Sequence, residues 1–370
     1  MPDAQALARR WVREEILELG AYAVPAFDGQ VKLDAMENPH GWSSEMVAAW
    51  LEHLQKLALN RYPDPRAEAL TAGLRRFFNV PDAAQLMLGN GSDELIQLLC
   101  LALNRPGAGM LVPEPSFSMY AMISRFAGMR CVGVPLKADD FDLDLPAMLQ
   151  AIEREQPALV MLARPNNPTG NSFSREALEA VLDAAPGLVV VDEAYAPFAG
   201  ESVMAEIERR PNLLVMATVS KIGLAGLRLG LLAGSAGWIE QLDKLRLPYN
   251  INSLSQASAA FALQHEAELR ERIARVCHDR DVLHQALLSR DDLQVWPSEA
   301  NFLLVRLVNA DATAAHAGLR ARGVLVKNLD GSHPALTGCL RITVGSPEEN
   351  QLLLEALGGV LEACGQQKLR

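Results

Sequence analysis

Between about residues 86 and 234, short apolar runs alternate with segments of helical periodicity, and this alternation strongly constrains the fold. Runs this short are typical of strands buried on both faces. Strands that alternate with helices form a parallel sheet joined by crossover helices. Strands are expected at Leu86–Leu88, Met110–Val112, Cys131–Pro135, Leu159–Ala163, Leu188–Val191, Leu213–Ala217 and Leu229–Ala233, and helices at Asp93–Leu103, Phe117–Phe126, Leu145–Arg154 and Arg175–Ala184.

The pattern changes after residue 250. A long helical stretch from Asn252 to about Ser289 precedes the apolar runs Gln294–Trp296, Phe302–Arg306, Val324–Lys327 and Leu340–Val344, and a terminal helix is expected from Pro347. The predicted class is α/β, with a mostly parallel seven-stranded sheet in a large domain and a smaller α+β domain. Because 370 residues exceed the usual size of one core, we expect an N-terminal arm with part of the small domain at 1–45, the large domain at 46–250 and the rest of the small domain at 251–370.

Composition excludes several classes of protein. Apolar residues make up 49% of the chain, which is enough for a sizeable core. The net charge is −11 and the basic residues are scattered, so nucleic acid is not an expected partner. Residues 1–20 are charged and amphipathic without the apolar core of a signal peptide, and no apolar run reaches membrane-spanning length. We therefore expect a cytoplasmic protein without membrane contact.

The cysteines indicate neither disulfides nor a metal site. The chain contains five cysteines with no CxxC pair, mostly among apolar neighbours, at Cys100, Cys131, Cys277, Cys339 and Cys364. Such spacing favours reduced, buried thiols. No metal is expected.

Chemically active side chains follow two of the predicted strands. Asp192 and Tyr195 come directly after Val189–Val191, and Lys221 follows Leu213–Ala217, with Arg228 seven residues later. The carboxyl ends of parallel strands meet at one edge of a sheet, where ligands bind. Taken singly, the acid could cap a helix, the phenol could pack in the core and the guanidinium could pair on the surface. Together they predict a site with an amine, a carboxylate, a phenol and a guanidinium.

Two loops could complete that site. Gly89–Glu94 follows a strand and opens a helix, so its amides could cradle an anion; a plain turn capped by Ser92 or Asp93 is the alternative. Glu94 stands where a dinucleotide fingerprint needs its third glycine, which disfavours a nicotinamide cofactor. Asn166–Gly170 could be simple turn chemistry or could present the amide of Asn167.

These blocks resemble the fold-type I pyridoxal-phosphate-dependent aminotransferases, and within them the histidinol-phosphate aminotransferase family. The likeness spans nearly the whole chain. It is carried by Lys32–Pro39, Asn60–Asp64, Gly89–Glu94, Asn166–Gly170, Val191–Tyr195, Ser220–Arg228, Tyr249–Ser253, Ser298–Phe302 and Cys339–Gly345. Two blocks are typical of the whole superfamily, Asn-Pro-Thr-Gly and Ser-Lys. Three others narrow the resemblance to the histidinol-phosphate aminotransferase family: Arg-Tyr-Pro-Asp, Ser-Glu-Ala-Asn-Phe and Cys-Leu-Arg-Ile-Thr-Val-Gly.

The resemblance implies a role for each matching residue towards pyridoxal phosphate. Lys221 would bind the cofactor covalently and, once freed, carry a proton between the substrate Cα and the cofactor. Asp192 would pair with the ring nitrogen, Tyr195 and Asn167 would hydrogen-bond the ring oxygen, and an aromatic ring, that of Phe117, would stack on the cofactor. The phosphate would be held by Ser92, Asp93, Thr218, Ser220 and Arg228. Tyr62 would reach the neighbouring subunit's cofactor, which implies a homodimer with shared active sites.

The resemblance also implies the substrates. Arg341 would clamp a carboxylate, and Lys327, Tyr22 and Asn38 are candidates for further substrate contacts, although a solvated lysine and a packing tyrosine are equally plain interpretations of two of them. The implied reaction interconverts histidinol phosphate and 2-oxoglutarate with imidazole-acetol phosphate and glutamate by a ping-pong mechanism in histidine biosynthesis. Histidinol phosphate has no carboxylate, so the same guanidinium is expected to bind glutamate's α-carboxylate in one half-reaction and the phosphate in the other.

The chain departs from the family pattern at three places. Phe117 stands where tyrosine is usual, Met36 occupies a usually polar position, and the loop Ile222–Leu227 is one residue shorter than in many relatives, which we expect the backbone to absorb. Three alternatives stay open: a threonine-phosphate decarboxylase, a broad aromatic or aliphatic aminotransferase, and a cofactor-sensing regulator. The last would need a DNA-binding domain, for which the segment before Lys32 is expected to be too short.

Overall fold

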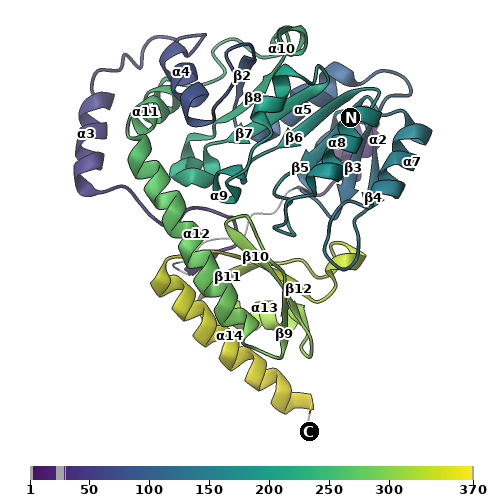
Figure 1. Cartoon of the computed structure of the whole chain (residues 1–370), viewed down its shortest axis with the longest axis vertical. Coiled ribbons are helices and arrows are strands. Elements are labelled where there is room, and N and C mark those ends of the chain that lie inside the picture. Colours follow the sequence, from purple (N-terminus) through teal and green to yellow (C-terminus); the bar gives the residue numbers. More distant parts are fainter. Residues whose placement is uncertain (1–2, 22–28, 30, 369–370) are drawn as a thin grey trace.

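The computed structural model describes residues 3–21, 29 and 31–368, which form two sheets with helices packed around them (Figure 1). The larger sheet has seven strands in the order β2-β8-β7-β6-β5-β3-β4. Only β8 runs antiparallel to its neighbours. The bounds are β2 Gln85–Gly89, β3 Gly109–Glu114, β4 Arg130–Pro135, β5 Leu159–Ala163, β6 Leu188–Asp192, β7 Leu213–Thr218 and β8 Gly230–Gly234. The predicted mostly parallel seven-stranded sheet is confirmed.

The central strands are apolar throughout because both faces of the large sheet are covered. Along β6, Val189 and Val191 pack into one core cluster, whereas Leu188 and Val190 pack into the cluster on the opposite face. This is the period-two alternation of a strand. The helices around the sheet are α4 Glu68–Phe77, α5 Ser92–Leu103, α6 Met119–Phe126, α7 Leu145–Glu155, α8 Arg175–Ala184 and α10 Ala236–Asp243. In the central strands β6 and β7 the polar residues, Asp192 and Thr218, stand at the last position, which places them at the carboxyl edge of the sheet.

The smaller sheet has five strands in the order β1-β11-β12-β10-β9. Its strands are β1 Val31–Leu33, β9 Leu293–Val295, β10 Phe302–Leu307, β11 Val324–Asn328 and β12 Cys339–Thr343, and α13 Ala312–Ala321 and α14 Pro347–Lys368 pack on it. Strand β1, which the sequence did not predict, pairs in parallel with β11. An N-terminal segment is thereby built into a sheet made otherwise of C-terminal residues.

The helical stretch predicted from Asn252 to about Ser289 is interrupted once. The structure has two helices, α11 Ser253–Gln264 and α12 Glu266–Leu288, separated at His265, whose φ of −102° and ψ of 41° are not helical. Helix α12 then runs from the large sheet down to the small one (Figure 1). A smaller correction concerns α6, which begins at Met119, so that Phe117 lies in the turn before the helix.

The remaining helices lie near the N-terminus and the sheet edge: α1 Ala4–Trp11, α2 Glu14–Leu17, α3 Ser44–Leu54 and α9 Ala196–Ala199. No helix among the described residues is both long and apolar enough to cross a membrane. Of the cysteines whose side chains are described, Cys100, Cys131, Cys277 and Cys339, none forms a disulfide. In the same part of the chain, no three His, Cys, Asp or Glu side chains lie together as a metal ligand set.

Candidate active site

A cavity lies at the edge of the large sheet where β3, β5, β6 and β7 end. The structure brings together most of the residues predicted from the sequence. The cavity is lined by Ser92, Asp93, Phe117, Asn167, Asp192, Tyr195, Thr218, Ser220, Lys221 and Arg228, together with Met36, Ala163 and Ala194.

Lys221 lies in a single π-helical turn, Ser220–Leu224, that directly follows β7. Its Nζ donates a hydrogen bond of 3.3 Å to the carbonyl oxygen of Ala35. Burial lowers the pKa of Lys221 to about 8, and the positive charge of Arg341 acts in the same direction. At neutral pH about one molecule in ten therefore carries a neutral amine, far more than for an exposed lysine. A neutral amine is the form that can act as a nucleophile or a base.

The loop between Lys221 and Arg228 has an irregular backbone. The π-helical turn is followed directly by a 3₁₀ turn, Ala225–Leu227. Gly223 has a φ of 103° and Arg228 a φ of 49°, both in the left-handed region. The backbone thus accommodates the short connection.

Asp192 is the last residue of β6, and its carboxylate is buried. Burial raises its pKa to about 6, but two donors favour the ionised form. The Tyr120 hydroxyl donates to Oδ2 at 2.7 Å, and the amide of Ala194 donates to Oδ1 at 3.1 Å. Tyr120 was missed from the sequence. Its only signal is its place three residues after Phe117, whose ring it meets edge-on at 5.4 Å.

Asn167 connects the two sheets. Its Nδ2 donates to the Tyr195 oxygen at 3.3 Å, and its Oδ1 accepts from Arg341 Nη1 at 2.6 Å. Tyr195 in turn lies with its hydroxyl 3.3 Å from the sulfur of Met36. Arg341 comes from β12 of the small sheet, so the site is complete only with both sheets in place.

The turn before α5 is the segment predicted to cradle an anion. Gly91 has a φ of 79°, and a Cβ there would lie 2.8 Å from Nη2 of Arg228. That guanidinium also contacts Asp93 Oδ2 at 3.3 Å. Helix α5 begins at Ser92, so its unpaired amides and positive end face the cavity that Ser92 lines. The positive φ at position 91 favours glycine, and a side chain there would also displace the Arg228 guanidinium.

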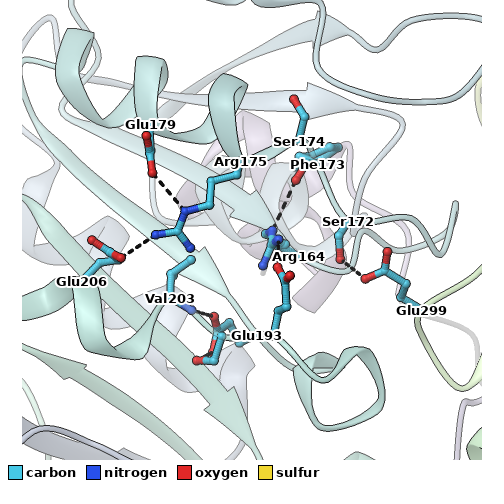
Figure 2. Close-up of polar contacts among 12 residues, drawn as sticks. Arg164, Ser172, Phe173, Ser174, Arg175, Glu179, Glu193, Val203, Glu206 and Glu299 are labelled. Atoms are coloured by element: carbon cyan, nitrogen blue, oxygen red, sulfur yellow. Dashed lines mark hydrogen bonds and ion pairs between the residues drawn. The ribbon is translucent and has the colours of Figure 1, made fainter.

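A polar network supports the loops beside the cavity (Figure 2). The carboxylate of Glu193 accepts from the Val203 amide at 2.6 Å, and burial raises its pKa to about 7. The side chain of Arg164 donates to the Phe173 carbonyl at 3.3 Å, across the loop that carries Asn167. Ser172 donates to Glu299 at 2.7 Å, which ties this loop to the segment before β10.

Four predicted site residues within the described part of the chain do not line this cavity, namely Tyr62, Lys327, Asn38 and Arg341, the last of which bonds the lining residue Asn167. The ring of Tyr62 is 80% exposed and stacks on Tyr249 at 4.5 Å. Lys327 pairs in register with Arg341 along β11 and β12. Asn38 lines a neighbouring cavity of about 760 Å³ and accepts from the His40 amide at 2.9 Å. Tyr22 lies outside the described residues.

Comparison with known proteins decides the family. The family model for aminotransferase class I and II matches residues 28–357. The chain belongs to this aminotransferase family. Enzymes of the family depend on pyridoxal phosphate, which confirms the cofactor predicted from the sequence.

Named relatives of this aminotransferase confirm the narrower resemblance. The chain is 51% identical to histidinol-phosphate aminotransferase 2 of Nitrosococcus oceani over 94% of this chain and 96% of that protein. It is 53% identical to the histidinol-phosphate aminotransferase of Chromobacterium violaceum, again over 94% and 96%. The structure matches the histidinol-phosphate aminotransferase of Sinorhizobium meliloti in complex with pyridoxal 5′-phosphate with a TM-score of 0.81, at 27% identity, covering 98% of this chain and 95% of that one.

The residues of this aminotransferase fit the cofactor. A buried amine of lowered pKa, at Lys221, can condense with an aldehyde. The carboxylate of Asp192 can pair with a protonated ring nitrogen, and the cradle at Gly91 and Arg228 can receive a phosphate. The aldehyde, the ring nitrogen and the phosphate of pyridoxal phosphate would therefore each meet a chemically matched group in this cavity.

Proposed function

We propose that this aminotransferase interconverts histidinol phosphate and 2-oxoglutarate with imidazole-acetol phosphate and glutamate by a ping-pong mechanism, as a step of histidine biosynthesis. The observation that carries the proposal is one cavity that joins Lys221 and Asp192 of the large sheet to Asn167, which holds Arg341 of the small one. The identity of about one half to the two named relatives supports the choice of substrate.

The cofactor, when bound, supplies an electron sink that stabilises negative charge at the substrate Cα. Asp192 would hold the ring nitrogen protonated, and its own charge is maintained by the donors Tyr120 and Ala194. Tyr195 and Asn167 would hydrogen-bond the ring oxygen. The ring of Phe117 would stack on the cofactor, and the phosphate would be bound by Ser92, Asp93, Thr218, Ser220 and Arg228.

Lys221 would remove the proton from the substrate Cα. Its pKa of about 8 suits a general base that works near neutral pH. The hydrogen bond to the Ala35 carbonyl fixes the direction of the amine. Proton transfer depends on such orientation as much as on basicity.

Arg341 would bind the substrate anion. Its two terminal nitrogens bond Asn167 and the Asp34 carbonyl, at 2.6 and 2.9 Å, so the planar guanidinium is held on the small-sheet side of the site. We propose that it binds glutamate's α-carboxylate in one half-reaction and the phosphate of the other substrate in the second. Lys327, Tyr22 and Asn38 are proposed as further substrate contacts.

We further propose a homodimer in which Tyr62 completes the partner's site. Support comes from the exposure of Tyr62 and from its place in a patch of exposed apolar side chains, namely Leu59, Tyr62, Leu247, Tyr249 and Leu254. Large exposed apolar patches mark interaction surfaces. Mixing Lys221→Ala with Tyr62→Ala protein tests this: a hybrid dimer with one intact site should recover activity that neither variant has alone.

The proposed domains are 1–45, 46–250 and 251–370, with the first and last parts sharing the small sheet. A cytoplasmic location is also proposed. It is supported by the absence of disulfides among the four cysteines whose side chains are described.

The activity is tested by the visible absorbance of the holoenzyme before and after addition of histidinol phosphate. Conversion of the aldehyde to the amine form of the cofactor is expected, and 2-oxoglutarate should reverse it. Lys221→Ala should abolish the change, whereas the surface variant Lys244→Ala should retain it. Unphosphorylated histidinol should react poorly. Carbon dioxide release from threonine phosphate with no response to histidinol phosphate would refute the proposal.

A further inference from the structure

Three consecutive carbonyl groups after β1 point at three different side chains of the site. The Asp34 carbonyl accepts from Arg341 at 2.9 Å and the Ala35 carbonyl from Lys221 at 3.3 Å. The Met36 carbonyl accepts from Nδ2 of Asn301 at 2.9 Å. We call residues 34–36 the strap. It joins an amine of the large sheet to a guanidinium of the small sheet.

The strap has an unusual backbone at Met36. The φ of Met36 is 55°, in the left-handed region that an L-residue other than glycine or asparagine seldom occupies. Two small-sheet side chains hold it there. Thr343 Oγ1 accepts from the Met36 amide at 3.0 Å, while Asn301 donates to the Met36 carbonyl. Both backbone groups of this residue are therefore fixed from outside the strap.

Asn301 and Thr343 are buried polar residues that the small-sheet core does not require. Asn301 is fully buried, at 0% exposure, and within the described part of the chain its Oδ1 has no hydrogen-bond partner. An unsatisfied buried oxygen is costly. On β12, Thr343 lies on the same strand face as Arg341, whereas Ile342 packs into the small-sheet core. The side-chain bonds from Asn301 and Thr343 to Met36 suggest a role beyond packing.

We propose that Asn301 and Thr343 are positioning residues for proton transfer: by holding Met36 in the left-handed conformation, they aim the Ala35 carbonyl at the amine of Lys221. This inference rests on the proposed function for the role of that amine. Through the strap, the position of the small sheet then determines the orientation of the Lys221 amine. A Lys221 amine without this acceptor would sample more orientations and reach the productive one less often.

The titration of Lys221 reports the contact without any substrate. A carbonyl acceptor stabilises the ammonium form, so its loss lowers the pKa of the lysine. Among the charged groups around it, Arg341 and Arg228 lower this pKa, and Glu37 and Asp93 raise it. None of these is changed by substitution at Asn301 or Thr343. Arg341 also keeps its bond to Asn167, so its charge stays in place.

The test uses Thr343→Val, which removes the hydroxyl at nearly constant volume, and Asn301→Leu as an independent second variant. Ile342→Val is the matched control, because it perturbs the same strand on the opposite face. Thr343→Ser should behave as the parent protein because it keeps the acceptor. Two quantities are measured: kcat and KM of the holoenzyme, and the pKa of Lys221 in the apoprotein from the pH dependence of its acylation, followed by mass spectrometry of the Lys221 peptide.

We expect Thr343→Val to lower kcat by roughly tenfold with KM changed less than about twofold, and to lower the pKa of Lys221 measurably. In a Met36→Asn background, where the side chain itself favours the left-handed conformation, the same substitution should cost only about twofold in kcat. Equal behaviour of Thr343→Val and Ile342→Val would overturn the inference. So would a fall in kcat with an unchanged titration of Lys221. Because the titration needs no substrate, an error in the proposed function would leave this result intact.

Discussion

Tyr120→Phe is the substitution whose effect follows most directly from the structure. It keeps the buried ring and its edge-on contact with Phe117 but removes the hydroxyl that donates to Asp192 at 2.7 Å. A hydrogen bond to a charged group contributes about 1.5–3 kcal/mol. At about 1.4 kcal/mol per pKa unit, its loss raises the pKa of the carboxyl by about one to two units. From about 6, the pKa of Asp192 would move to the range of about 7–8.

The consequence is a loss of the ionised carboxylate at neutral pH. Because the proposed role of Asp192 needs its charge, the acidic limb of kcat/KM against pH should move upward by about one to two units, and activity should recover towards pH 9. Cofactor affinity at pH 7 should fall about tenfold for the same reason. Both quantities are measured on the holoenzyme across a pH series, the second by dialysis and absorbance.

The control is Ser124→Ala, a buried position of the same helix whose hydroxyl bonds the nearby Ala121 carbonyl and does not contact Asp192 in the described hydrogen bonds. It should leave the pH profile unchanged. If Tyr120→Phe shows the parent profile, or if Ser124→Ala shifts it equally, the electrostatic account of Asp192 is wrong.

Three further perturbations follow from the described contacts. Burial raises the pKa of Glu193 from 4.5 to about 7, so between these pH values the folded state binds more protons than the unfolded state, and this group lowers the free energy of unfolding by up to about 3 kcal/mol as pH rises from 4.5 to 7. In Glu193→Gln, urea unfolding at a series of pH values should show a smaller loss of stability over this range, and the same pH dependence as in the parent protein would contradict the account. Gly91→Ala should weaken cofactor binding about tenfold or more, because the residue has a φ of 79° and its Cβ would lie 2.8 Å from the Arg228 guanidinium. Equilibrium dialysis measures the affinity for pyridoxal phosphate, and an affinity equal to that of the parent protein would show that this turn does not hold the phosphate. Arg341→Lys should raise the KM for glutamate at least about tenfold, since ammonium cannot reproduce the two-pronged contact, and steady-state kinetics with an unaltered KM would exclude Arg341 from carboxylate binding.

The large sheet was predictable because burial on both faces leaves its strands without polar residues. Leu159–Ala163 was predicted with its observed bounds, and the other predicted strand ends of this sheet lie within two residues of the observed ones. The three-residue β1 was not predictable: Val31-Lys32-Leu33 has no distinctive pattern and becomes a strand only by pairing with β11, almost 300 residues away. The break at His265 was also missed, because both flanking segments favour helix. There the ring packs on Phe261 at 4.4 Å.

The residues of the site can likewise be divided into those that the sequence predicts and those that it does not. Asp192, Lys221 and Asn167 were found because each follows a strand of one parallel sheet, and parallel strands end together. Tyr120, Asn301 and Thr343 act through bonds that span 72, 265 and 307 positions of the chain. Spacing in a sequence carries no information about such pairs. They depend on the packing of helix α6 on the sheet and of one sheet against the other.

Because β8 runs antiparallel to β7, the loop between them carries two of the predicted site residues. Since β8 begins at the edge of the sheet where β7 ends, the connection between them stays at that edge, and residues 219–229 carry both the amine of Lys221 and the guanidinium of Arg228 that is proposed to bind the phosphate. The loops after β3, β5 and β6 are separate segments, so the length of each can change without changing the others. A change of length between Lys221 and Arg228 instead acts on both groups at once, so the one-residue difference from many relatives has to be absorbed inside this loop, where Gly223 and Arg228 have left-handed backbones.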